Sequence, residues 1–411
     1  MRTVRYRWTT IREAVAVGDQ SLSGIKVVDV TQGIAGPHAG MLLAQHGATV
    51  IKLEPLEGDW GRTLGKRYDD LSAQAIVFNR GKKSLAVDLK TGQGRDIARR
   101  LASDSDVVLE SYRPGVMSRL GLGYEDIRAM RPDVIYLSIS GFGQRGPYSG
   151  LPVTDSVIQA FSGWMTLHKD PDGTPTRSGI TAIDVMTGLY AYQAIASALI
   201  RRLRFGEGAY IDCSMLQSAA AFQAAKILEH YFEKGRPEAS YVPVGVMPTA
   251  DGYLSISAMR DSHYAALCRV LGRAELATHP RFDSRDKRRA NKEELMALLR
   301  DEFRKRKTAD WERELTEAGV MNSRVNAYQD FLADGHVKEA GTFGYADHGA
   351  LGLAPVANIP GADLFAGDRE RAWCPHVGEH SRAVLTAHGY GEDEIASLEA
   401  AGVIRQARRD A

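Results

Sequence analysis

The feature that most restricts the fold of this chain is an alternation of strand-like and helix-like segments between residues 24 and 143. Apolar runs typical of buried strands lie at 24–30 and 48–55, and the segment 38–47 between them is typical of a helix. The rhythm continues with strand-like runs at 84–89, 106–111 and 130–143 and a helix-like segment at 92–104. Parallel strands need such crossover helices. We therefore predict an α/β fold with a doubly wound, mostly parallel, Rossmann-like sheet and a ligand beyond the carboxyl ends of its strands.

A second domain is expected because 411 residues are too many for one ordinary hydrophobic core. The pattern changes near Ala225, where a helix-like segment runs into a polar linker. Residues 241–258 are typical of a hairpin with its turn at Asp251-Gly252, and helices with charged faces follow to about Arg324. We expect these segments to form a smaller α+β domain.

The charge balance and the cysteines exclude several classes of protein. A formal net charge of +1 argues against broad binding to nucleic acid or anionic membranes, and no apolar run approaches the ~20 residues of a membrane span. Three scattered cysteines are too few for a disulfide framework, so a reducing compartment is expected. The arginine-rich segment 1–17 is either a transit peptide or an ordinary extension. We predict a cytoplasmic protein, with the mitochondrial matrix as the alternative, that has no nucleic-acid or membrane partner.

Glycines and basic residues after the first strands offer two candidate phosphate sites. Gly33, Gly36 and Gly40 form a glycine-containing turn before a helix, but their spacing is not G-x-G-x-x-G and Pro37 removes one N–H donor. A dinucleotide site is therefore improbable, and a plain tight turn fits at least as well. The basic cluster of Arg80, Lys82 and Lys83, with Lys90 nearby, suits either a solvated hairpin or a ligand with several phosphates.

Two further patterns favour ordinary structure over a special site. Cys374, His376 and His380 have a spacing that suits metal ligation, but no second Cys/His pair accompanies them, so we predict no metal site. The basic stretch 281–307 contains interleaved acidic residues, which is typical of an exposed helix face rather than a nucleic-acid arm.

Asp184 stands at the head of a long apolar segment that carries no other charge before Arg201. It is either the N-cap of a helix or a carboxylate that takes part in chemistry, and the two roles are compatible. The helix dipole and backbone N–H bonds would both favour the ionised carboxylate. An ionised carboxylate is what a nucleophile requires.

Seven segments together resemble the class III (CaiB/BaiF-type) CoA-transferases, a family that includes formyl-CoA and succinyl-CoA-dependent transferases. The segments, in family-like order and spacing, are AGPHAGMLLAQHGATVIKLEPLEGD, NRGKKSLAVDLKT, ESYRPGVMSRLGLGYEDI, IYLSISGFGQRGPY, TDSVIQAFSGWM, AIDVMTGLYAYQAIASALI and PHVGEH. The resemblance implies a large CoA-binding α/β domain built from residues 1–224 and 352–411, with a small α+β domain at 225–351. It also implies a homodimer whose two chains interlock like links.

The resemblance further implies which residues form the site. Asp184 heads the D-x-x-x-G-x-x-A segment and corresponds to the family nucleophile, with Asp155 in a supporting role. Lys90 and Arg119 are expected to meet the phosphates of CoA. A glutamine often found at the position of Ile34 is absent here. The residues expected to contact CoA are Ile34, Ala35, Val87, Asp88, Leu89, Lys90, Ser111, Tyr112, Arg113, Arg119, Leu151, Pro152, Val153 and Thr154.

The implied activity is transfer of CoA from an acyl-CoA to a carboxylic acid through an aspartyl anhydride and an aspartyl-CoA thioester. CoA is then a substrate rather than a tightly bound cofactor. One alternative is an α-methylacyl-CoA racemase, but the racemases that resemble this chain place a histidine where Thr154 stands. Another alternative is a catalytically silent CoA-binding paralogue, against which the presence of Asp184 argues.

The acids that are exchanged are only partly constrained. The glycine-rich lid GGGGQ of formyl-CoA transferases has no counterpart between Tyr231 and Asp261, which argues against formate/oxalate exchange. Arg62 and Arg260 are candidates for binding the carboxylate of the acceptor.

Overall fold

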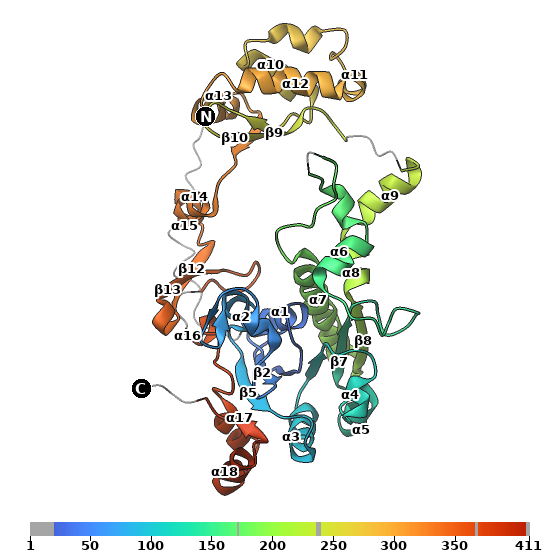
Figure 1. Ribbon diagram of the computed structural model, residues 1–411, viewed down its shortest axis with the longest axis vertical. Helices are drawn as coiled ribbons and strands as arrows, with labels where there is room; N and C mark the ends of the chain where they lie inside the picture. The colour runs from blue at the N-terminus through green and yellow to red at the C-terminus, as the bar shows by residue number, and fades with distance from the viewer. Residues whose placement is uncertain (1–19, 171, 236–239, 366–368, 408–411) are drawn as a thin grey trace. The chain divides into compact units, whose positions relative to one another are not determined.

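The computed structural model describes residues 20–170, 172–235, 240–365 and 369–407, which form two compact units. The larger unit contains the described residues of 1–224 and 341–411, and the smaller unit contains those of 225–340 (Figure 1). The second boundary differs from the expected one at 352, because β12 (Phe343–Asp347) pairs with β13 (Leu353–Ala357) in an antiparallel hairpin. A boundary at 352 would divide that hairpin.

A seven-stranded sheet forms the centre of the larger unit, in the order β14-β5-β2-β1-β6-β7-β8. All its strands run parallel except β14, which pairs antiparallel with β5 at one edge. The prediction of a mostly parallel α/β sheet is therefore confirmed. The strands are β1 (Lys26–Asp29), β2 (Thr49–Glu54), β5 (Lys83–Val87), β6 (Val107–Glu110), β7 (Ile135–Ser140), β8 (Ala209–Ser214) and β14 (Ile404–Arg405).

Helices cover both faces of this sheet, which explains why its inner strands are almost continuously buried. Successive side chains of a strand point to opposite faces, so Val27 joins one core cluster and Val28 the other. The Val27 face packs against α1 (Ala35–Gln45) and α7 (Ala182–Phe205). The other face packs against α3 (Gly92–Ser103), α5 (Tyr124–Met130), α17 (Ser381–Ala387) and α18 (Glu392–Ala400).

The helix α7 packs closely against α1, and a glycine makes this approach possible. A Cβ atom at Gly188 would lie 2.7 Å from Cβ of His38 and 2.8 Å from the carbonyl oxygen of Ala35. His38 Nδ1 lies 3.0 Å from the carbonyl oxygen of Val185, which links the two helices beside Asp184. Burial lowers the pKa of His38 to about 4, so the ring is neutral near pH 7 and donates this bond.

In the described part of the chain, α7 is the one helix whose length and composition would suit a membrane span. Its buried residues include Ala191, Ile195 and Ala198, spaced by three and four positions, and all three belong to the core cluster shared with α1 and the sheet. The helix is therefore part of the core of the larger unit.

Shorter elements complete the larger unit. They are α2 (Ala73–Asn79), α4 (Val116–Arg119), α6 (Asp155–Phe161), α8 (Met215–Phe222) and α16 (Arg369–Ala372), with β3 (Arg67–Tyr68), β4 (Leu71–Ser72) and the 3-10 helices η2 (Trp60–Thr63), η3 (Trp164–Leu167) and η5 (Gly349–Leu351).

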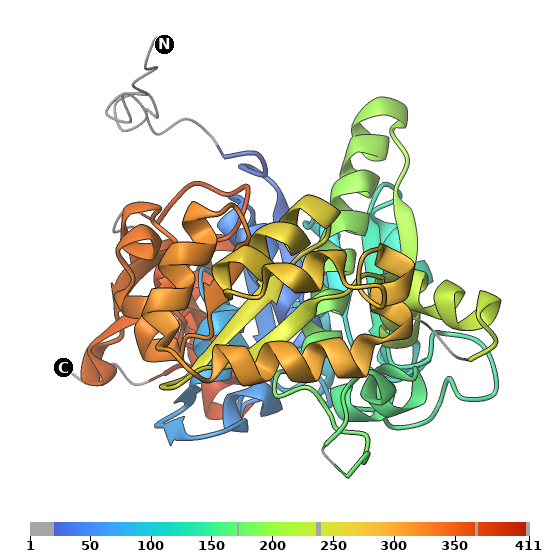
Figure 2. The same ribbon diagram turned by 90° about the horizontal axis from the view of Figure 1, so that it is seen from above.

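The smaller unit has its own core, built from a three-stranded antiparallel sheet and helices (Figure 2). Its strands β9 (Val244–Pro248) and β10 (Tyr253–Ser257) form the predicted hairpin, and β11 (Met321–Arg324) pairs with β10. The helices are α10 (Asp261–Val270), α11 (Arg285–Ala290), α12 (Lys292–Phe303), α13 (Thr308–Glu317), α14 (Tyr328–Ala333) and α15 (Gly335–Glu339), with η4 (Ala274–Thr278); α9 (Ala224–Phe232) begins at the boundary.

Candidate active site

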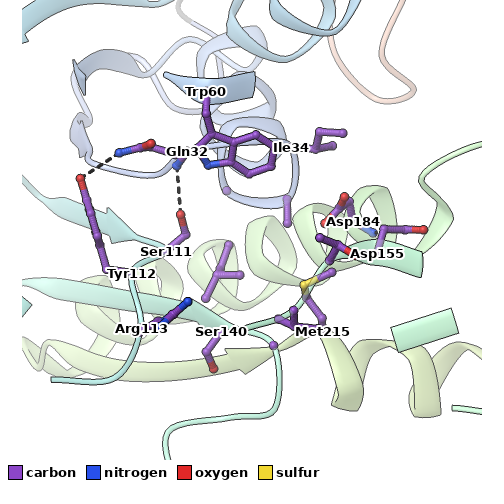
Figure 3. Close-up of a pocket in the computed structure, with 16 residues that line it drawn as sticks. Gln32, Ile34, Trp60, Ser111, Tyr112, Arg113, Ser140, Asp155, Asp184 and Met215 are labelled. Carbon is purple, nitrogen blue, oxygen red and sulfur yellow. Dashed lines mark hydrogen bonds between the residues drawn. The ribbon is translucent and has the colours of Figure 1, made fainter. Parts of the chain in front are cut away.

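A cavity of about 330 Å³ opens in the larger unit at the carboxyl ends of β1, β6 and β7. This is the edge at which ligands bind in open α/β sheets. The loops after these strands supply much of its wall, and the starts of α6 and α7 supply two carboxylates (Figure 3). The lining residues are Gln32, Ile34, Ala35, Gly36, Trp60, Ser111, Tyr112, Arg113, Ile139, Ser140, Gly141, Val153, Thr154, Asp155, Asp184 and Met215.

Asp184 lies in the first turn of α7 and is not its N-cap, so the N-cap interpretation is wrong. The N-cap position belongs to Thr181, whose side chain makes no capping hydrogen bond. Asp155, the first residue of α6, performs the capping from outside the helix. Its Oδ2 atom accepts the backbone N–H of Ile183 at 2.7 Å and that of Asp184 at 3.1 Å. The Asp184 side chain therefore lines the cavity instead of closing the helix end (Figure 3).

The electrostatic environment of Asp184 also differs from the expected one. Burial, and secondarily the negative charge of Asp155, raise the pKa of Asp184 to about 7. We had expected the helix dipole and N–H bonds to keep this carboxyl ionised, but desolvation and the second carboxylate outweigh them. Asp184 therefore holds its proton at a higher pH than an ordinary aspartate does.

The cavity brings together nine of the residues that the resemblance implied. Asp184 and Asp155 are joined there by Ile34, Ala35, Ser111, Tyr112, Arg113, Val153 and Thr154. The other seven, which are Val87, Asp88, Leu89, Lys90, Arg119, Leu151 and Pro152, lie outside its lining. Lys90 and Arg119 are exposed and follow the strands β5 and β6 at the same carboxyl edge of the sheet. Their contact with CoA phosphates stays a prediction.

Seven lining residues lie outside the set that the resemblance implied, although Gly36 belongs to the glycine turn considered as a phosphate site: Gln32, Gly36, Trp60, Ile139, Ser140, Gly141 and Met215. Gln32 connects two walls, because its Nε2 donates to the Tyr112 hydroxyl at 3.0 Å and its backbone N–H donates to Ser111 Oγ at 3.0 Å. The useful signal was topological, since Gly141 and Met215 directly follow the parallel strands β7 and β8, and Gln32 lies in the loop after β1. Trp60 lies farther from a strand, six residues after the end of β2.

The basic cluster before β5 is largely structural. Lys82 is buried, and its Nζ lies 2.8 Å from Asp29 Oδ2, 2.8 Å from the Pro37 carbonyl oxygen and 3.0 Å from Asn79 Oδ1. Arg80 is also buried and donates to the carbonyl oxygen of Ala357. These two cations are therefore not available for phosphates, whereas Lys83 is exposed.

Arg62 is not available for an acceptor carboxylate either. Its guanidinium is buried and donates to both oxygens of Glu54, each at 2.8 Å, and to the carbonyl oxygen of Pro375 at 2.9 Å. The other candidate, Arg260, is exposed in the smaller unit.

The glycine turn after β1 functions in packing. Gly33 has φ +84°, which favours glycine, and its N–H donates to Asp59 Oδ1 at 2.8 Å. A Cβ at Gly36 would collide with Thr31. The plain-turn interpretation describes this segment, although Gly36 also lines the cavity.

Cys374, His376 and His380 each have a different partner. Cys374 Sγ lies 3.2 Å from the Ala75 carbonyl oxygen, and His380 Nδ1 accepts the backbone N–H of Ser84 at 3.3 Å. His376 Nδ1 contacts Asp70, which raises the pKa of this imidazole. The three side chains therefore do not converge on one point, and the absence of a metal stays a prediction.

Comparisons with known proteins agree with this architecture. The family model of CoA-transferase family III matches residues 22–381. Succinyl-CoA:glutarate CoA-transferase of Mus musculus is 34% identical over 411 residues, covering 97% of this chain and 94% of that protein. Succinyl-CoA--D-citramalate CoA-transferase of Chloroflexus aurantiacus is 33% identical over 402 residues, covering 93% and 98%.

A solved structure of similar fold leads to the same family. The CaiB/BaiF family protein of Brucella suis superposes with a TM-score of 0.79 at 33% identity, covering 90% of this chain and 100% of that one. The chain therefore belongs to CoA-transferase family III and is a CoA-transferase that acts on CoA thioesters.

Proposed function

We propose that this CoA-transferase works by covalent catalysis at Asp184. The observation that carries the proposal is the position of this carboxylate, which lines a cavity at the carboxyl edge of the sheet beside Asp155. An oxygen of Asp184 attacks the carbonyl carbon of the donor thioester, the C–S bond breaks, and a mixed anhydride and CoA thiolate form. The thiolate then attacks the aspartyl carbonyl carbon, which forms an aspartyl-CoA thioester and releases the donor acid as its carboxylate.

The second half of the reaction reverses these steps with another acid. A carboxylate oxygen of the acceptor attacks the aspartyl-CoA carbonyl carbon and releases the thiolate, which leaves a second anhydride. The thiolate attacks the acyl carbon that came from the acceptor, so a new acyl-CoA forms and Asp184 returns to its free carboxylate. No proton is consumed overall.

The walls of the cavity suit intermediates that water would destroy. Ile34, Trp60 and Met215 present apolar surface around Asp184 (Figure 3), and such surface limits the access of water to an anhydride. Asp155 occupies the backbone N–H groups of Ile183 and Asp184, so it orients the turn that carries the nucleophile. We assign Asp155 the role of a positioning residue.

We further propose succinyl-CoA as the donor and a small dicarboxylic acid as the acceptor, in line with the names of the two relatives above. Mixing the enzyme with succinyl-CoA or acetyl-CoA and a panel of acids should give new acyl-CoA products identifiable by mass. Hydroxylamine added during turnover should convert Asp184 to a hydroxamate. Exchange of solvent deuterium at the α-carbon of an acyl-CoA without any acceptor, and no CoA transfer, would instead support the racemase chemistry.

The pH dependence should report the ionisation of Asp184. Because the nucleophile must be ionised and burial raises its pKa to about 7, kcat/KM should fall about tenfold per pH unit below pH 7. Asp155→Asn keeps an oxygen for the N–H groups of Ile183 and Asp184 but removes the negative charge. The pH at which kcat/KM begins to fall should then be lower by roughly 0.5–1 pH unit, while burial keeps the pKa of Asp184 above the ordinary aspartate value.

The measurement is kcat/KM across pH for both proteins, with thermal melting as the control for folding. If kcat/KM of Asp155→Asn falls at the same low pH as that of the unchanged enzyme, the charge of Asp155 does not affect the ionisation of Asp184.

The oligomeric state, the CoA-phosphate contacts and the location of the enzyme are proposed from the family resemblance. We propose an interlocked homodimer, because α7 and α8 expose the large apolar side chains of Leu203, Phe205 and Phe222 on the larger unit. CoA-phosphate contacts at Lys90 and Arg119 and a cytoplasmic location are likewise proposals. The segment 1–17, on which the transit-peptide interpretation depends, lies outside the described residues.

A further inference from the structure

We propose that Trp60 sets the upper size limit of the acyl group that is exchanged at Asp184, so that short-chain acids are preferred to long-chain or bulky aryl acids. This inference rests on the proposed function. Trp60 lines the cavity together with Asp184, and 52% of its surface is exposed. Figure 3 shows its indole ring beside Ile34, facing the space that separates Asp184 from Arg113.

The segment that carries Trp60 is held by buried charges. Asp59 caps η2, and its Oδ1 accepts the backbone N–H groups of Gly61 and Gly33, each at 2.8 Å. The Oδ2 atom of Asp59 forms an ion pair of 2.9 Å with Lys52 Nζ, and both side chains are fully buried. Lys52 Nζ also donates to the carbonyl oxygen of Thr31 at 2.8 Å. The Asp59–Lys52 ion pair and its hydrogen bonds therefore connect the start of η2 to the loop after β1.

The indole ring cannot move toward that loop. A Cβ built on Gly33 would lie 2.3 Å from Cζ2 of Trp60, so the ring lies directly against the glycine and fills the space on that side. A ligand that presses on the exposed side of the ring meets a wall with closely packed backbone behind it. Fixed apolar walls discriminate against extra methylene groups by about 10–200-fold.

The size of the cavity indicates which acids fit. About 330 Å³ lies at the lower end of small-molecule sites, and this space has to accommodate the thioester end of CoA as well as the acyl group. Trp60 and Ile34 line this cavity together with Asp184, so the indole ring bounds the cavity on that side.

The test is the acid selectivity of Trp60→Ala and Trp60→Phe. The assay measures kcat/KM for a homologous series of straight-chain dicarboxylic acids and for aryl acids, with succinyl-CoA as the donor. In Trp60→Ala the ratio of kcat/KM for long or aryl acids to that for the shortest acid should rise at least about tenfold. For Trp60→Phe this ratio should lie between the values of the alanine variant and the unchanged enzyme. The phenylalanine variant keeps the test usable if the alanine variant does not fold.

A matched control is available in the same segment. Glu57→Ala changes an exposed side chain three positions earlier that does not line the cavity, so its selectivity should equal that of the unchanged enzyme. An unchanged ratio in both Trp60 variants, or an equal loss on every acid, would overturn the inference. If the unchanged enzyme transfers CoA to no acid in the panel, the proposed function fails instead, so the two failures are distinguishable.

Discussion

Asp184→Ala is expected to lower kcat for CoA transfer by roughly 10³–10⁶-fold, the range seen when a covalent nucleophile is removed. Without the carboxylate, no anhydride and no aspartyl-CoA thioester form, and only the binding of the two substrates remains. Steady-state kinetics with succinyl-CoA and the best acceptor measure the loss. Binding of acyl-CoA, measured by calorimetry, should change far less, because Asp184 is one of sixteen residues around the cavity.

Two conservative variants separate the chemistry of Asp184 from its shape. Asp184→Asn has the same size but an amide that cannot act as the nucleophile, so its kcat should fall as far as that of Asp184→Ala. Asp184→Glu keeps a carboxylate and moves it by one methylene group, for which a loss of about 10²-fold is expected. Hydroxylamine should label the unchanged enzyme at residue 184 and leave the alanine and asparagine variants unlabelled. Full CoA transfer by Asp184→Ala would contradict the proposed mechanism.

A stability measurement distinguishes lost chemistry from lost folding. The pKa of Asp184 is about 7 in the folded protein and near 3.8 when the chain is unfolded, so the fold loses stability as the pH rises from about 4 to 7, and the full penalty is present above pH 7. Asp184→Asn removes this penalty and should raise the free energy of unfolding by about 1–3 kcal/mol at pH 8, less than full burial would give because the carboxyl faces the cavity. The gain should shrink as the pH falls from 7 toward 4. An inactive variant that is more stable is typical of a functional residue.

The sheet of the larger unit could be predicted largely from local patterns. Alternating apolar runs and helix-like segments indicate parallel strands because each strand is buried on both faces and each crossover needs a helix. The antiparallel edge strand β14 contains only Ile404 and Arg405, and a segment that short leaves no periodicity to detect. Its place beside β5 depends on contacts between the two ends of the chain.

Residues of the candidate site could be predicted only where they lie in a loop at the carboxyl end of a parallel strand. The loops at 32–36 and 111–113 follow β1 and β6, so their arrival at one edge is a consequence of the parallel sheet. The pKa of Asp184 and the capping by Asp155 depend on a contact between residues 29 positions apart. Burial of a charge likewise depends on folded-state partners, so the sequence indicated Arg62 as a candidate for binding the acceptor carboxylate and did not show its buried contacts with Glu54 and Pro375.

Lys82→Met is expected to lower the free energy of unfolding of the larger unit by about 3–5 kcal/mol, because it leaves the carboxylate of Asp29 buried without its ion-pair partner. Both side chains of this pair are fully buried and the charged atoms lie 2.8 Å apart. Burial opposes the ionisation of Asp29, but the adjacent Lys82 and Lys52 lower its pKa, so the carboxylate is charged at neutral pH. Burial lowers the pKa of Lys82 to about 8, which still leaves it mostly protonated at pH 7.

The neighbouring lysine is a matched control, since Lys83 is exposed and begins β5 directly after Lys82. Lys83→Met should change the free energy of unfolding by less than about 0.5 kcal/mol in urea titrations followed by circular dichroism. The double variant Asp29→Asn/Lys82→Met should recover much of the loss, because it removes the unpaired charge along with its partner. If Lys82→Met instead has the same free energy of unfolding as the unchanged protein and a higher KM for acyl-CoA, then Lys82 contacts the phosphates of CoA. The buried geometry argues for the first result, because an ammonium group held by three oxygens has no donor left to offer a ligand.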